Sequence, residues 1–113
     1  MQVLFESRDP RAAHLRETAE HRVRFVMRRL AWLVPRARVL LSDVNGPRGG
    51  VDKRCQVELK TDRSGTVVIT SVARDWRVAL DQALVRAFRA LVRVGRRNQA
   101  HGRSTQRAVS FDH

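Results

Sequence analysis

The chain has few of the residues that would tie it to an oxidising compartment or a membrane. Its single cysteine, Cys55, cannot form an internal disulfide bond. No apolar run reaches the roughly 20 residues that a membrane-spanning helix needs. The first residues also lack the basic-then-apolar pattern of a secretion signal. We therefore expect a soluble, cytoplasmic protein with no segment inserted in a membrane.

The sequence also lacks a recognisable catalytic or metal-binding set. His14 and His21 stand seven residues apart, about two helical turns, which is too far for one metal ion without a ligand between them. The other two histidines lie near the end of the chain, and the eleven acids are scattered along it. We therefore expect no enzyme activity, no cofactor, no metal and no small-molecule substrate.

Arginine is what the chain has in excess. Of its 23 basic residues only Lys53 and Lys60 are lysines, so twenty-one are arginines, and the formal net charge is +12. The planar guanidinium can bind two phosphate oxygens at once and is weakly hydrated. Nucleic acid is therefore the expected partner, with an anionic membrane surface as the alternative. A GC-rich genome would explain arginine in place of lysine, but not the net charge.

The apolar pattern predicts one α+β domain over residues 1–98 and a disordered basic tail over 99–113. The element order is β-α-β-β-β-α, a four-stranded sheet with two helices packed on one face, and the last three strands form an antiparallel meander. Asp9 and Asp75 are the expected helix N-caps, and Pro35 ends the first helix. A buried Cys55 thiol is expected on the third strand, the alternative being a reactive one. We expect strands at residues 2–6, 36–41, 54–60 and 66–72, and helices at 10–34 and 75–97.

The last helix combines an apolar face with a basic flank. Beyond Asp81 it carries no acid that could neutralise this flank. We interpret the flank as an RNA-binding surface, and the alternative is a solvated charged face without a ligand. At about 100° per residue, the flank consists of Arg86, Arg89, Arg93, Arg96 and Arg97. If the two helices pack side by side, the flank is extended by Arg24, Arg28 and Arg29 of the first helix.

Two further features have two interpretations each. Residues 45–50 are rich in glycine and are expected to form a turn between strands. Alternatively, their amides and Arg48 grip a backbone phosphate where the loop runs into Lys53, which makes Arg48 and Lys53 candidate RNA-binding residues. Trp32 is expected to pack at the end of the first helix; alternatively, it stacks on a base beside Arg28 and Arg29.

Two segments resemble a known family. Residues 41–55 read LSDVNGPRGGVDKRC, and residues 73–84 read ARDWRVALDQAL. Together they resemble the short form of the ribosome hibernation promoting factor and ribosome-associated inhibitor A family, also labelled sigma-54 modulation protein. The resemblance covers about residues 1–98 and implies the same β-α-β-β-β-α domain. It also implies binding in the mRNA channel of the small ribosomal subunit, where the domain keeps ribosomes idle in stationary phase or stress.

In that family the basic residues of the two helices face ribosomal RNA, which indicates the arginines named above as the contacts. The expected function is therefore translation inhibition by occupancy, in which the protein binds small-subunit rRNA and blocks the path of mRNA and tRNA. We expect a monomer away from the ribosome, and no ribosome pairing driven by this chain alone, because it lacks the second domain of long members. Two alternatives remain: a general RNA-binding protein or RNA chaperone off the ribosome, and a transcription-modulating protein-interaction module.

Overall fold

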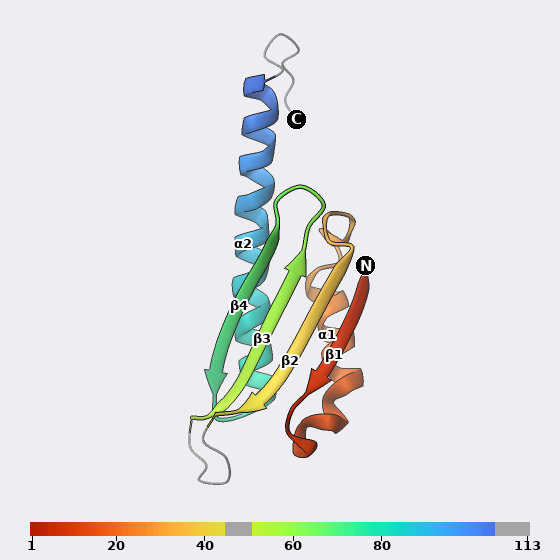
Figure 1. Ribbon diagram of the computed structural model, residues 1–113, viewed down its shortest axis with the longest axis vertical. Coiled ribbons are helices and arrows are strands. Elements are labelled where there is room, and N and C mark those ends of the chain that lie inside the picture. Colours follow the sequence, from red (N-terminus) through yellow and green to blue (C-terminus); the bar gives the residue numbers. More distant parts are fainter. Residues whose placement is uncertain (45–50, 106–113) are drawn as a thin grey trace.

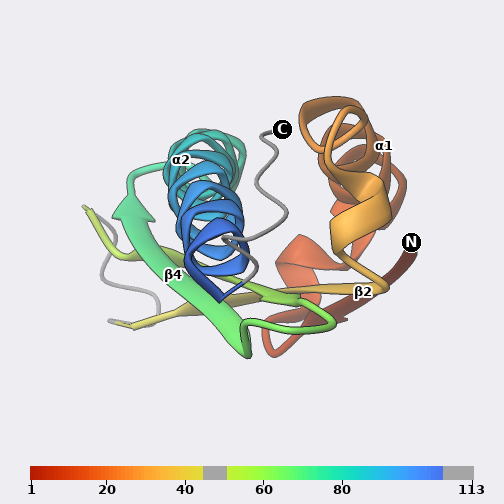
Figure 2. The ribbon, with the colours of Figure 1, turned by 90° about the horizontal axis from the view of Figure 1, so that it is seen from above.

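A mixed sheet carries both helices on one face (Figures 1 and 2). The computed structural model describes residues 1–44 and 51–105, with side chains described as far as Arg96. The strand order is β1-β2-β3-β4; β1 is parallel to β2, and the other neighbours are antiparallel. This confirms the predicted α+β fold and the meander. The strands are β1 (Gln2–Ser7), β2 (Arg36–Asp43), β3 (Lys53–Lys60) and β4 (Thr66–Ala73).

Alternation along the two central strands separates a buried face from an open one. Val39 of β2 lies opposite Val57 of β3, and Leu41 lies opposite Cys55; all four side chains are fully buried under the helices. Burial raises the pKa of the Cys55 thiol to about 12, so the thiol is protonated at neutral pH. The expectation of a buried cysteine is confirmed.

The first helical segment is not the single helix predicted over residues 10–34. A 3₁₀ helix, η1 (Pro10–Leu15), precedes α1 (Arg16–Val26), and a second one, η2 (Ala31–Leu33), follows a turn. The reason is the three-residue spacing of the apolar side chains at both ends. Hydrogen bonds that span three residues, from Leu30 to Met27 and from Leu33 to Leu30, continue the chain after α1, and all three side chains pack in or against the core.

Helix α2 (Trp76–Thr105) begins as predicted. The Asp75 carboxylate accepts a hydrogen bond from the Arg77 backbone amide at 2.6 Å, so Asp75 is an N-cap. The helix continues past the expected end at residue 97, since no proline follows Pro47 and arginine, glutamine and alanine favour helix. Its last turns extend beyond the sheet (Figure 1) and include the start of the segment predicted to be a tail. Residues 106–113 lie outside the described residues.

The two helices lie side by side over the sheet, as the view along α2 shows (Figure 2). Helix α1 packs on β1, and α2 packs on β3 and β4. An ion pair between Arg22 of α1 and Asp81 of α2 joins the helices at the surface, with Nε of Arg22 3.1 Å from the Asp81 carboxylate. Both helices are thereby fixed to one platform, and their outward sides determine which charges the molecule presents.

Candidate nucleic-acid interface

The outward side of α2 carries four exposed arginines, Arg86, Arg89, Arg93 and Arg96, which we call the α2 ridge. They recur at intervals of three and four residues, so they stay on one side of the helix. The opposite side, which includes Leu84 and Leu91, is buried against the sheet. The packing that holds the helix therefore fixes the backbone positions of these arginines, while their side chains remain exposed.

Within the described part of the chain, no ion pair joins an α2 ridge arginine to an acid. Arg86 donates a hydrogen bond to the Thr70 carbonyl oxygen of edge strand β4 at 2.8 Å. Arg89, Arg93 and Arg96 keep their charges toward solvent. The side chain of Arg97, the fifth predicted member, lies outside the described residues. That these groups contact RNA stays a prediction.

Arg24, a basic residue of the first helix, lies on the opposite flank of the helical layer from the α2 ridge. Arg24 donates to the Met1 carbonyl oxygen at 3.1 Å, beside the β1 edge of the sheet, whereas Arg86 bonds to β4 at the other edge. Arg28 lies over the ring of Phe25 at 4.2 Å, and Arg29 is exposed in the turn after α1. Although the helices are side by side, Arg24 and Arg86 do not belong to one continuous ridge.

Lys53, predicted as an RNA ligand, is already held by two carboxylates. Its ammonium nitrogen lies 2.7 Å from Oδ1 of Asp52 and 3.1 Å from Oδ2 of Asp43, and its side chain is only 14% exposed. The hydrogen bond to the fully buried Asp52 raises the pKa of Lys53. This geometry does not favour a phosphate contact by Lys53. Arg48 falls in residues 45–50, outside the described residues.

Lys53 belongs to a larger acid-paired cluster, made of Asp9, Arg11, Asp43, Asp52 and Lys53. One guanidinium nitrogen of Arg11 lies 2.7 Å from both Asp9 and Asp43. The hydrogen bond from Arg11 lowers the pKa of Asp9 to about 2. The cluster joins the ends of three strands through side chains that are distant in sequence, and no local signal in the sequence indicates it.

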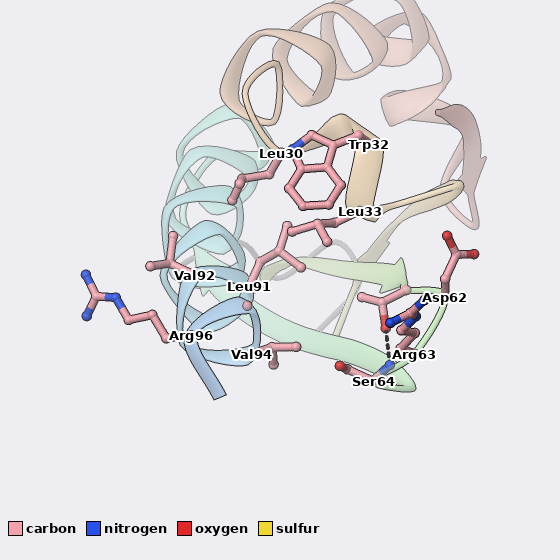
Figure 3. Close-up of a pocket in the computed structure, with 12 residues that line it drawn as sticks. Leu30, Trp32, Leu33, Asp62, Arg63, Ser64, Leu91, Val92, Val94 and Arg96 are labelled. Atoms are coloured by element: carbon pink, nitrogen blue, oxygen red, sulfur yellow. Dashed lines mark hydrogen bonds between the residues drawn. The ribbon is translucent and has the colours of Figure 1, made fainter. Parts of the chain in front are cut away.

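The expectation that Trp32 packs at the end of the first helix is wrong, because its side chain is 74% exposed. It lines a groove of about 600 Å³ between η2, the connection from β3 to β4 and the second half of α2 (Figure 3). Leu30 and Leu33 pack against the core instead, which leaves the indole at the surface. We call this feature the Trp32 groove. Its lining includes Leu30, Leu33, Arg63, Leu91, Val92 and Arg96.

The described residues offer no set of three histidine, cysteine or acidic side chains that could hold a metal ion. His14 and His21 are both exposed. None of the described helices is both long enough and apolar enough to cross a membrane. The α2 ridge and the Trp32 groove are the two surface features that make up the candidate site.

No protein-family model and no curated protein sequence matches this chain. Its fold is shared by several solved structures, of which two serve as examples. A ribosomal subunit interface protein from Coxiella burnetii has a TM-score of 0.65 at 13% identity, covering 82% of this chain and 96% of its own. The N-terminal domain of Protein Y from Thermus thermophilus has a TM-score of 0.60 at 20% identity, covering 85% of this chain and 98% of its own. Both match the family that the sequence resembles, and at these identities the likeness shows the shared fold.

Proposed function

We propose that this protein is a ribosome-associated translation inhibitor that binds the rRNA of the small subunit and blocks the path of mRNA and tRNA. The observation that carries the proposal is the α2 ridge, a row of exposed arginines that no acid neutralises within the described residues. The shared fold with a ribosomal subunit interface protein supports the ribosome as the source of the RNA. The sequence resemblance supports the same partner.

The chemistry required of the ridge is phosphate binding. Guanidinium groups donate paired hydrogen bonds to phosphate oxygens, and folded RNA offers its backbone and shape more readily than its base edges. Little sequence specificity is therefore expected from these contacts. Because α2 is packed on the sheet along its buried side, the backbone positions of the arginines form one row before binding. Binding then has to order the arginine side chains but not the helix that carries them.

Inhibition by this route needs no covalent step. A folded domain in the mRNA channel excludes mRNA and tRNA from the space it fills. The protein therefore competes with mRNA and tRNA for the small subunit. The protein should therefore bind vacant small subunits and should be displaced from, or fail to enter, subunits loaded with mRNA and tRNA. The inhibition should also be reversible when salt weakens the phosphate contacts.

Gradient sedimentation of purified small subunits with the pure protein, across a salt series, tests the proposal. With about six phosphate contacts, affinity should fall about a thousandfold between 50 and 200 mM salt. Subunits loaded with mRNA and tRNA should bind much less protein than vacant ones. Free duplex RNA added as a competitor should be far less effective than small subunits. Equal competition would indicate a general RNA-binding protein, and a failure to sediment with subunits at low salt would refute the proposal.

A further inference from the structure

The Trp32 groove lies beside the α2 ridge but has a different chemistry. Its walls are apolar side chains from η2 and from the second half of α2, and the connection between β3 and β4 closes one side (Figure 3). At about 600 Å³ it falls within the range of roughly 300–1,000 Å³ typical of sites for small organic groups. It can therefore accept a flat, apolar-faced group of the size of a nucleobase.

Trp32 is presented to this groove by a well-anchored segment. Backbone hydrogen bonds from Leu33 to Leu30 at 2.9 Å and from Val34 to Ala31 at 3.0 Å fix η2 around it. Leu30 and Leu33 pack against the core, while the indole is 74% exposed. A large aromatic side chain that stays at the surface of a rigid segment provides a ready stacking face.

The charges around the groove select an anionic partner. Arg63 and Arg96 line it from two different elements, and Asp62 is the only acid among the lining residues. Arg96 also belongs to the α2 ridge, so the groove continues directly into the row of unpaired arginines. An apolar peptide would gain nothing from these cations, whereas a nucleic-acid strand offers a phosphate next to every base.

We propose that the Trp32 groove binds one unstacked base of single-stranded RNA, with the base stacked on the indole and its neighbouring phosphates near Arg63 and Arg96. A base in a duplex already has both faces covered, so the ligand must be a loop, a bulge or a free strand. The proposal rests on the proposed function in taking RNA as the partner, and it adds a site for a base to a surface that otherwise binds only phosphates.

The two tryptophans permit a direct optical test, because Trp76 is buried and Trp32 is exposed. In the Trp76→Phe protein, Trp32 is the only tryptophan. A short oligouridylate should quench its fluorescence, because a stacked base quenches indole emission. An abasic strand of equal length should bind through its phosphates with little quenching. Equal quenching by both strands, or none with oligouridylate that is seen to bind by anisotropy, would overturn the proposal.

Substitutions give an independent test by affinity. Trp32→Ala should weaken oligouridylate binding about tenfold, because the stack of one base on the indole is lost, while Trp32→Phe should retain most of the affinity. The slope of log affinity against log salt should stay unchanged, because no charge is lost. The exposed position makes a folding defect unexpected, and thermal unfolding checks this.

A side chain that fills the groove should also weaken oligouridylate binding, even though Trp32 is intact. A Cβ added at Gly95 would lie 3.9 Å from Cδ1 of Leu33, so Gly95→Ala fits, whereas Gly95→Leu extends into the groove. Oligouridylate affinity should fall for Gly95→Leu and stay near wild type for Gly95→Ala. Unchanged affinity for both Gly95→Leu and Trp32→Ala would refute the base site. So would a Trp32-dependent, salt-insensitive self-association or protein contact, which would show an apolar protein partner in the groove.

These experiments distinguish a failure of the base site from a failure of the proposed ribosomal function. Quenching by oligouridylate without binding to small subunits would support the base site and refute the ribosomal role. If the protein binds ribosomes and Trp32→Ala changes its affinity for no RNA, the ribosomal role is supported and the base site is refuted. If Trp32→Ala also weakens binding to vacant subunits, the base belongs to ribosomal RNA; if it weakens only oligonucleotide binding, the base belongs to a free strand such as mRNA.

Discussion

The molecule holds its cations in two different ways. In the acid-paired cluster, Arg11 and Lys53 each lie within 3.1 Å of two carboxylates. On the α2 ridge, Arg89, Arg93 and Arg96 are exposed without an ion pair to any acid among the described residues. Positive charge therefore stabilises the fold in the acid-paired cluster, whereas on the α2 ridge it is available to an external anion. Basic character alone does not identify a binding surface.

The difference arises from what surrounds each group. The cluster lies where β1 and β2 end and β3 begins, and the adjoining segments bring three aspartates together there. The ridge lies on a helix without an acid after Asp81 and above strand β4, which has none. A cation is neutralised when neighbouring elements supply acids, and these neighbours are known only once the sheet is assembled.

Reversing the charge of the ridge should have the largest effect. Replacing Arg89, Arg93 and Arg96 with glutamate should weaken binding to small subunits by about a hundredfold or more, because phosphate contacts are lost and repulsion replaces them. The fold should remain, since these side chains are exposed. Co-sedimentation and circular dichroism measure the two effects.

The matched control makes the same change in net charge away from α2. Its positions are Arg8, Arg36 and Lys60, all exposed; the last two face each other across β2 and β3 on the open side of the sheet. This triple glutamate variant should bind subunits with only a small loss from the change in overall charge. Equal losses in the two variants would mean that net charge, not the ridge, drives binding.

Lys53→Met should have the opposite effects to the ridge variant: a large loss of stability and little change in RNA binding. The substitution leaves the fully buried Asp52 carboxylate without its ammonium partner, which should lower the thermal unfolding midpoint on the order of 10 °C. Calorimetry measures the midpoint, and filter binding measures the affinity at a temperature where both proteins are folded. A tenfold loss of affinity with unchanged stability would place Lys53 in the interface instead.

Single substitutions in the ridge and in the acid-paired cluster should differ in how the affinity for small subunits depends on salt. Arg93→Gln should reduce the slope of log affinity against log salt by about 0.7 to 0.9, the loss of one phosphate contact. Arg11→Gln should leave the slope unchanged, because Arg11 is engaged by Asp9 and Asp43. Titrations of each variant with small subunits at several salt concentrations supply the slopes. A smaller slope for Arg11→Gln than for Arg93→Gln would contradict this distinction.

The smallest effect concerns pH. The folded-state pKa of Asp9 is about 2, below its ordinary value of 3.8, so its pairing stabilises the fold above about pH 4 and is lost as pH falls toward 2. Asp9→Asn can still accept the Arg11 amide hydrogen bond but has no charge to lose. Its unfolding midpoint should therefore change less between pH 4 and 2 than that of the wild type. If the unfolding midpoints of the two proteins fall in parallel as pH is lowered, Asp9 does not contribute to acid unfolding.

Local patterns in the sequence were sufficient to predict most of the fold. Alternation around Cys55 predicted the third strand, and Asp75 predicted the start of α2 because an N-cap is a local signal. The break after Val26 could not be predicted, since apolar residues spaced by three and four suit both a continuous α-helix and an α-helix that ends in 3₁₀ turns. Only packing against the finished sheet decides between them.

The candidate site was predictable only where it lies on one helix. The α2 ridge follows from helical periodicity and from the lack of acids after Asp81. The pairing of Lys53 with Asp43 and the position of Arg24 beside β1 depend on contacts between distant segments, which periodicity does not contain. The exposure of Trp32 likewise depends on which neighbours η2 packs against the core.

The most direct test is a structure of the protein bound to the small ribosomal subunit. The account predicts that the guanidinium groups of Arg89, Arg93 and Arg96 lie within hydrogen-bonding distance of rRNA phosphates, and that the domain fills space used by mRNA and tRNA. Arg11 should still pair with Asp9 and Asp43, as in the free protein. A complex in which α2 faces solvent and the open side of the sheet meets the subunit would contradict it.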